Sequence, residues 1–166
     1  LKIARVCPVY KTGDPQDFTN YRPISILPSI SKIFEKLVYN RLSAYLTKHS
    51  ILYKNQYGFR TNHDTCMAVT EMVEKISNAI DTNCFAIGVF IDLSKAFDTL
   101  DHAILLKKLE HYGIRGIPLA WFQSYLTNRY QYVDYYGVHS VKLKIRTGVP
   151  QGSILGPLLF LLYIND

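Results

Sequence analysis

The stretch C-F-A-I-G-V-F-I-D-L-S-K-A-F-D, residues 84–98, decides how the rest of the chain is interpreted. Residues 84–91 form a continuous apolar run, which is typical of a strand buried on both faces. Asp92 ends the run at the carboxyl end of the expected strand, where metal and phosphate sites are commonly built. Its carboxylate suits Mg²⁺, so Asp92 is a candidate catalytic residue; the alternative is that it only caps the following turn.

Helices and strands are mixed on both sides of this stretch without a strict βαβ rhythm, so the expected fold class is α+β. The other expected strands are residues 2–10, residues 21–27 and an antiparallel hairpin of residues 130–137 and 141–146. The expected helices are one from Ser29, one capped by Asp64 or Thr65, one from Asp101 to Tyr112, one with Pro118 in its first turn and one that ends at Tyr163.

The first two of these helices are expected to bury an apolar stripe, because their apolar residues recur every three or four positions. In the first helix the stripe consists of Ile30, Ile33, Phe34, Leu37, Val38, Leu42, Tyr45 and Leu46. In the second it consists of Ala68, Val69, Met72, Val73, Ile76 and Ile80.

The composition indicates a single folded domain. The chain has 166 residues, 48% hydrophobic and 19% charged, which excludes wholesale disorder. Its formal charge of +6 permits a polyanionic partner without identifying one. The three cysteines are far apart and form no C-x-x-C pair, which argues against a structural zinc site and favours a reducing compartment. The most apolar stretch, residues 154–164, is too short to span a membrane, so no membrane partner is expected.

Polar residues after Asp92 offer a second, weaker candidate site. Asp98 and His102 are four residues apart and, with Asp101, could form a hydrolytic metal site on one helix face. The favoured interpretation is that these residues cap and brace the start of a helix, where negative charge is stabilising.

Two other segments could contact a ligand. Residues 148–157 contain three glycines and two prolines, and Gln151 adds an amide donor and acceptor. Near the start of the chain, Lys11 and Arg22 could hold phosphates. A tight turn and solvated loop cations explain the same residues without a ligand.

Four motifs in a fixed order carry more information than these residues do one by one. They are K-T-G-D…N-Y-R-P-I-S-I-L-P from Lys11, Q-Y-G-F-R from Gln56, F-I-D-L-S-K-A-F-D from Phe90 and G-V-P-Q-G-S-I-L-G-P-L-L-F from Gly148. In these motifs the chain resembles the reverse transcriptase of LINE-type retrotransposons, which lack long terminal repeats, and in particular the jockey-like type. The resemblance covers essentially all 166 residues.

This resemblance implies the right-hand architecture of fingers, palm and thumb. By similarity, residues 1–85 belong to the fingers, residues 86–116 begin the palm, residues 117–145 return to the fingers and residues 146–166 re-enter a truncated palm. The thumb would be absent. Because the chain starts at Leu1 inside an apolar segment and stops directly after another, we expect it to be a fragment of a longer protein.

The resemblance also implies roles for the turn that follows the expected strand. Asp92 would bind both catalytic metal ions, and Leu93 would offer its backbone carbonyl to one of them. Lys95 and Ala96 would give backbone N–H groups to the triphosphate. Phe97 would be a steric gate that selects deoxynucleotides, because its ring fills the space that a ribose 2′-hydroxyl needs.

Other motifs are similarly implicated. Arg22 resembles the fingers arginine that clamps the triphosphate, and Lys11 more loosely resembles a nearby lysine. Gln151 and Gly152 resemble the pair that lies against the nucleotide sugar and the template–primer. For the motif that consists of Gln56, Gly58, Phe59 and Arg60, both template contact and packing within the fingers are open.

The implied enzyme is an RNA-directed DNA polymerase whose partners are an RNA template, a DNA primer and deoxynucleoside triphosphates. Its cofactor is Mg²⁺ or Mn²⁺, with two ions in the complete enzyme. The family places a second aspartate pair, in an aromatic-x-Asp-Asp hairpin, beyond the last residue of this chain. One aspartate cannot position two metal ions, so we expect the fragment alone to be inactive.

Two other functions stay open. The chain could be a non-catalytic RNA-binding remnant, in which Lys142, Lys144 and Arg146 on one strand face follow the phosphates, with Arg60 as a further nucleic-acid contact. It could also be a metal-dependent phosphohydrolase that uses Asp92 together with Asp98 and His102.

Overall fold

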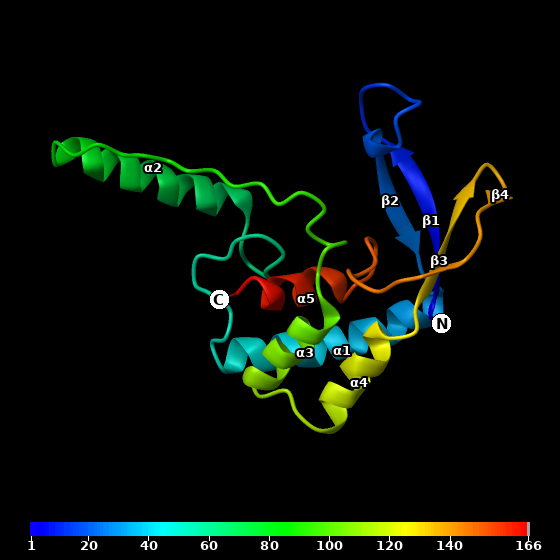
Figure 1. The fold of residues 1–166 in the computed structure, drawn as a ribbon. Coiled ribbons are helices and arrows are strands. Elements are labelled where there is room, and N and C mark those ends of the chain that lie inside the picture. The colour runs from blue at the N-terminus through cyan, green and yellow to red at the C-terminus, as the bar shows by residue number, and fades with distance from the viewer. Residues whose placement is uncertain (166) are drawn as a thin grey trace.

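The computed structural model describes residues 1–165 and has the mixed α+β fold expected from the sequence (Figure 1). In chain order, the elements are β1 (Ile3–Tyr10), the 3₁₀ turn η1 (Phe18–Asn20), β2 (Tyr21–Ile26), α1 (Ser29–Lys48), α2 (Thr65–Asp81), α3 (His102–His111), α4 (Ile117–Leu126), β3 (Tyr130–Tyr135), β4 (Val138–His139), β5 (Leu143–Lys144) and α5 (Gly156–Tyr163). The strands gather on one side of the molecule, and four of the helices form a body beside them, whereas α2 projects away (Figure 1).

The sheet joins the start of the chain to residues 130–144. Its order is β2-β1-β3-β4, and β5 also pairs with β3. β1 pairs with β2 antiparallel and with β3 parallel, with Ile3 opposite Tyr130 and Val6 opposite Val133. β4 and β5 both run antiparallel to β3, so the expected hairpin is confirmed.

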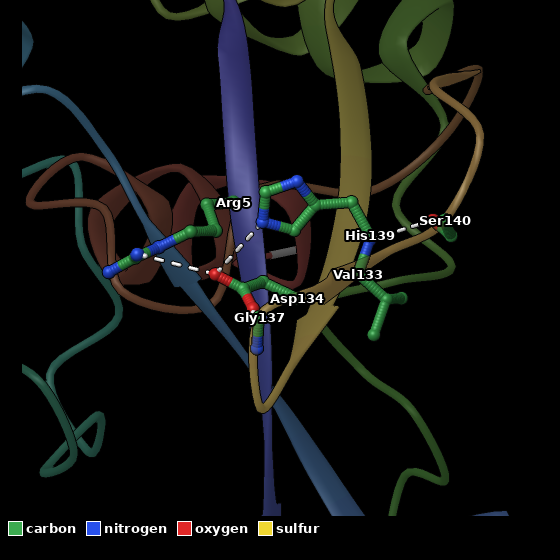
Figure 2. Close-up of polar contacts among 6 residues, drawn as sticks. All are labelled: Arg5, Val133, Asp134, Gly137, His139 and Ser140. Carbon is green, nitrogen blue, oxygen red and sulfur yellow. Dashed lines mark hydrogen bonds and ion pairs between the residues drawn. The ribbon is translucent and has the colours of Figure 1, made fainter.

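A polar contact reinforces the pairing across the sheet (Figure 2). The carboxylate of Asp134 on β3 lies 3.3 Å from the guanidinium of Arg5 on β1 and 3.5 Å from the imidazole of His139 on β4. The Val133 N–H also donates to the Ser140 hydroxyl, at 2.9 Å. These contacts connect three strands at one register, although exposed ion pairs add little stability.

The main core lies among α1, α3, α4 and α5. Leu105 and Leu109 of α3 are fully buried, as is Leu159 of α5. The sequence of α5 is G-P-L-L-F-L-L-Y, which is apolar on nearly every side, so this helix has to be covered by its neighbours all round. The core therefore forms around α5, which directly follows the loop at residues 147–153.

The helix caps expected from the sequence are present in the structure. The Asp64 carboxylate caps α2 by accepting from Met67 N–H, and Asp101 caps α3 by accepting from the N–H groups of Ala103 and Ile104. Gly113, just beyond α3, has a φ of +89°, in the left-handed region that favours glycine.

Residues 84–91 do not form the expected buried strand, and that prediction is wrong. The segment has no regular secondary structure and pairs with none of the described strands. Its side chains are open to solvent, with Phe85 99% exposed and Ile87 89% exposed. A strand is buried only when neighbours pair with its edges and cover its faces, and residues 1–165 supply neither here.

The burial expected for two helices is also wrong in part. α2 forms, but none of its residues is buried, and its apolar stripe faces solvent. In α1 the stripe is divided, because Leu42 and Leu46 are buried while Ile30 and Ile33 are exposed. Helical spacing predicts which residues share a face, but burial depends on whether another element covers that face. Among residues 1–165, no helix is long and apolar enough to cross a membrane.

The position of the core can be tested on α3. Leu109→Ala removes a fully buried side chain and leaves a cavity, so we expect the free energy of unfolding to fall by about 2–5 kcal/mol. Ile104→Ala on the same helix removes a side chain that is 46% exposed and should cost no more than about 0.5 kcal/mol. Urea denaturation followed by circular dichroism measures both; equal losses would contradict the placement of the core.

Candidate functional site

Residues 147–153, here called the glycine loop, dock on the segment that follows Asp92. The Val149 N–H donates to the Phe97 carbonyl at 2.8 Å, and the Gly148 N–H donates to the Leu100 carbonyl at 2.7 Å. The Thr147 hydroxyl donates to the carbonyl of Asp98, 49 residues away in the sequence. Backbone contacts therefore join two of the sequence motifs.

The other side of the glycine loop lies against β2. Ser25 N–H donates to the Gln151 carbonyl at 2.7 Å. Gly152 has a φ of +123°, and a Cβ at this position would lie 2.5 Å from the Ser25 carbonyl oxygen. A Cβ on Gly148 would lie 2.7 Å from the carbonyl oxygens of Phe97 and Asp98. Only glycine fits at both places, because the loop passes between two other backbones.

Side chains fix the loop further. The Gln151 amide donates from Nε2 to both carboxylate oxygens of Asp98, at 3.1 and 3.2 Å. The His102 Nε2 lies 2.7 Å from the Gly148 carbonyl oxygen. With its nitrogen turned toward Asp98, the Gln151 amide has its oxygen left for another group.

These contacts remove the basis of the hydrolytic metal site considered from the sequence. Asp98 precedes α3 instead of sharing a helix face with His102, and both side chains hold the glycine loop. No cluster of three or more potential metal ligands of the His, Cys, Asp or Glu type occurs within residues 1–165. Asp101 caps α3, as the favoured interpretation predicted.

A pocket of about 290 Å³ lies beside the loop. Its lining includes Ser25, Asp98 and Gln151, and two cations, Lys144 and Arg146. The pocket thus combines a small number of polar groups with positive charge next to the rigid loop, a combination that suits a phosphate-bearing ligand.

Phe97 lies where three motifs meet. Its ring packs edge-on against Phe59, with 5.9 Å between centroids, and at a tilt against Phe160, with 5.0 Å between centroids. Phe59 belongs to Q-Y-G-F-R, so this motif packs on Phe97, in a segment that the resemblance assigns to the palm. This contact tests neither packing within the fingers nor template contact. Arg60 donates from Nη1 to the carbonyls of Tyr53 and Lys54 and thereby closes its own loop.

The turn at residues 92–96 is more open. Asp92 and Leu93 are exposed, and Ala96 is half-buried. Lys95 has a φ of +55°, and its carbonyl accepts from the N–H groups of Asp98 and Thr99. The exposed carboxylate of Asp92 therefore stands at the entrance to a tight, hydrogen-bonded turn.

Three candidate cations do not line the pocket beside the glycine loop. Lys11 and Arg22 are exposed; Lys11 directly follows β1, and Arg22 is the second residue of β2. Lys142 is exposed just before β5 and does not line the pocket. The structure thus gathers Gln151, Lys144 and Arg146 at one pocket, joins Phe97 to the same loop through its carbonyl, and leaves these three cations out of the pocket lining.

A known protein family matches a stretch of the chain that contains both the segment after Asp92 and the glycine loop. The family described as "Reverse transcriptase (RNA-dependent DNA polymerase)" matches residues 9–166. The chain belongs to the reverse transcriptase family. The family resemblance stated from the motifs is therefore confirmed.

Individual relatives narrow the type of reverse transcriptase. The chain is 37% identical to the "Probable RNA-directed DNA polymerase from transposon BS" and 36% identical to the "RNA-directed DNA polymerase from mobile element jockey", both of Drosophila melanogaster. Each alignment covers 99% of this chain and 18% of the relative. The chain is thus a reverse transcriptase segment of the type found in retrotransposons without long terminal repeats, and it spans about 18% of the length of these relatives.

Reverse transcriptases generally use divalent metal ions. In this chain, the residues at the start of the turn after Asp92 suit such an ion. A Mg²⁺ ion typically takes one or two carboxylates and completes its shell with water and phosphate oxygens. The exposed carboxylate of Asp92 is a suitable donor, and the backbone carbonyl of Leu93 follows directly. Among the described residues, no group of three or more potential His, Cys, Asp or Glu ligands forms around them.

Two residues that shape the site are absent from the sequence candidates. Ser25 acts through its backbone, which no side-chain pattern reveals. Glu35 is buried on α1 and accepts from the backbone N–H groups of Ile154 and Leu155. A signal for Glu35 was available, because it precedes Leu42 by seven residues and therefore shares the apolar face of the helix.

The close approach of the glycine loop to β2 predicts the effect of a single methyl group. Gly152→Ala places a Cβ against the Ser25 carbonyl and should lower the free energy of unfolding by about 1–3 kcal/mol more than Gly137→Ala does. Gly137 is the matched control, since it also has a positive φ but no atom within 4 Å of the added Cβ. Urea denaturation compares the two; an equal loss would mean that the contact with Ser25 does not constrain the loop.

Proposed function

We propose that this chain forms the nucleotide-binding part of an RNA-directed DNA polymerase, which extends a DNA primer on an RNA template with deoxynucleoside triphosphates. The observation that carries the proposal is the docking of the glycine loop on residues 97–100. This docking joins the segment of Asp92 and Phe97 to that of Gln151 and Gly152, which lie in separate motifs.

In this proposal Asp92 and the carbonyl of Leu93 hold Mg²⁺, or Mn²⁺, with two ions in the complete enzyme. Bound divalent ions would supply charge stabilisation to the transferred phosphoryl group. Asp92 supports this role because its carboxylate is exposed and directly precedes a rigid turn. Because the described residues gather no group of three or more potential metal ligands, we propose that activity requires carboxylates from outside this chain.

The triphosphate would contact the backbone of the same turn. A turn that contains a left-handed residue can aim successive N–H groups at one anion, and Lys95 is such a residue. We therefore propose that the N–H groups of Lys95 and Ala96 bind phosphate oxygens. Arg22, as a bidentate fork, and Lys11, as a point charge, would approach the phosphates from the β1–β2 hairpin.

The sugar of the nucleotide would lie between Phe97 and the glycine loop. Phe97 is supported by Phe59 and Phe160, so its ring could resist displacement by a 2′-hydroxyl. Gln151 is held by Asp98 with its amide oxygen unused by that contact. Gly152, whose missing side chain lets the loop lie against the Ser25 carbonyl, would keep this part of the loop in place beside the sugar.

We also propose the division into fingers (residues 1–85 and 117–145) and palm (residues 86–116 and 146–166). The parallel pairing of β3 with β1 supports the return of residues 117–145 to the fingers, because it places both in one sheet.

A second candidate function is RNA binding without catalysis. Lys144 and Arg146 line the pocket beside Gln151, and phosphate contacts by such cations give a strongly salt-dependent affinity. Arg60 and Lys142 would extend this contact. In this case the chain would bind RNA but would not support primer extension in any context.

The catalytic role of Asp92 can be tested in a chimaera, in which this chain replaces the matching segment of the jockey polymerase. We expect the chimaera to extend a primer on an RNA template, and Asp92→Ala to lower that rate by about 10³-fold or more. Asp81→Ala, which removes an exposed carboxylate at the end of α2, should leave the rate unchanged. The chain by itself should extend no primer.

Activity that survives Asp92→Ala would refute the role of Asp92. A folded but inactive chimaera, together with salt-dependent RNA binding by the chain, would favour the second candidate function.

The role of Phe97 makes a separate prediction in the same chimaera. Phe97→Val opens space beside the sugar, so incorporation of ribonucleotides relative to deoxynucleotides should rise roughly tenfold or more. Phe160→Leu is a suitable control because it alters the support of the ring and leaves the ring itself in place. An unchanged ratio in Phe97→Val would show that Phe97 has only a packing role.

A further inference from the structure

Glu35 is a buried acid that the proposed nucleotide site does not use directly. Its side chain lies on α1 and is only 1% exposed. Among the buried residues of the described chain it is the one carboxylate. Burying a carboxylate is unfavourable unless hydrogen bonds replace those of water, so the contacts of Glu35 indicate why it is there.

Both oxygens of Glu35 accept hydrogen bonds from other elements. Oε2 accepts from the Ile154 N–H at 2.7 Å and from the Leu155 N–H at 3.4 Å. Oε1 accepts from the Tyr125 hydroxyl at 3.2 Å. The two N–H groups stand at the start of α5, where the helix dipole also favours a negative charge.

Tyr125 completes the surroundings of the carboxylate. Burial, and then the negative charge of Glu35, raise the pKa of Tyr125 far above its ordinary value, so its hydroxyl stays protonated and donates. The guanidinium of Arg129 lies over the Tyr125 ring, 4.9 Å from its centroid. A buried cation thus stands near the buried acid, on the same tyrosine.

The backbone between Glu35 and the site is short and stiff. Ile154 follows Gln151 by three residues, and between them the Ser153 N–H and hydroxyl both donate to the Pro150 carbonyl. The Ser153 hydroxyl also accepts from the Gly156 N–H at 2.9 Å. A displacement at Ile154 would therefore be transmitted to Gln151.

We propose that Glu35 is a positioning residue for nucleotide binding. Its carboxylate anchors the C-terminal side of the glycine loop, while Asp98 and Ser25 anchor the other sides, so that Gln151 is presented to the nucleotide in one orientation. This inference rests on the proposed function, because it assigns Gln151 to the nucleotide. It connects helix α1, which carries no residue of the proposed nucleotide site, to the geometry of that site.

The carboxylate is suited to this task in a way that a neutral group is not. Its two oxygens accept from three donors, and charged acceptors form stronger hydrogen bonds. Glu35→Gln keeps the size of the side chain but replaces one acceptor oxygen by an N–H₂ donor. This variant therefore tests the hydrogen bonds while leaving the packing of α1 nearly unchanged.

The first experiment is amide hydrogen exchange on this chain, which needs no polymerase activity. Glu35→Gln should speed exchange at Ile154 and Leu155 about tenfold or more, with no change in α3. Glu74→Gln makes the same charge change at an exposed position of α2 and should have no effect. Tyr125→Phe keeps both contacts to the backbone and should change the loop far less than Glu35→Gln does.

Unchanged exchange at Ile154 and Leu155 in Glu35→Gln would overturn the proposal. Equal acceleration in α3 would also overturn it, because Glu35 would then be a general stabiliser of the fold.

The second experiment measures primer extension by the chimaera. A displaced Gln151 weakens nucleotide binding but leaves Asp92 in place, so Glu35→Gln should raise KM for deoxynucleotides about tenfold and change kcat less than about threefold. An unchanged KM alongside faster exchange would reduce Glu35 to a helix cap and overturn its positioning role. If the unaltered chimaera extends no primer, the proposed function fails, whereas the exchange experiment still decides whether Glu35 holds the loop.

Discussion

Two backbone hydrogen bonds join the glycine loop to the segment that follows Asp92: Gly148 N–H to the Leu100 carbonyl and Val149 N–H to the Phe97 carbonyl. Both donors are on buried residues, so losing their acceptors would leave polar groups without water or protein partners. The contact also closes a long loop, whose entropic cost the surrounding core has to offset. The pocket is lined from both sides of this junction, by Asp98 and by Val149, and Gly148 is the residue that makes the approach possible.

The site divides into a rigid part and an open part. The glycine loop is held on three sides, by Asp98, Ser25 and Glu35. The turn that begins at Asp92 has an exposed carboxylate and a single left-handed residue, Lys95. This division suits a reaction in which one element has to define the position of a ligand, while another has to remain accessible to ions and phosphates.

Features set by near neighbours in the sequence could be predicted. The caps at Asp64 and Asp101 and the strands β1 to β3 follow from local residue preferences.

Contacts between distant segments could not be predicted from the sequence. The spacing of Asp98 and His102 indicated a shared helix face, whereas both residues bind the glycine loop. The motifs identified Gln151 through family resemblance, but its partner Asp98 lies 53 residues away and no periodicity points to it. The prediction that residues 84–91 are buried was wrong for the same reason, because a segment is buried only if other elements of the fold cover it.

The exposed run at residues 84–91 has a consequence for the behaviour of the protein in solution. Its sequence, C-F-A-I-G-V-F-I, is rich in strand-forming residues and contains neither a charge nor a proline, a combination that favours intermolecular β-pairing. Its unpaired backbone is a template for the same run in another copy. The formal charge of +6 opposes such encounters by mutual repulsion between copies. Salt screens this repulsion, so the colloidal stability of the chain depends on keeping the ionic strength low.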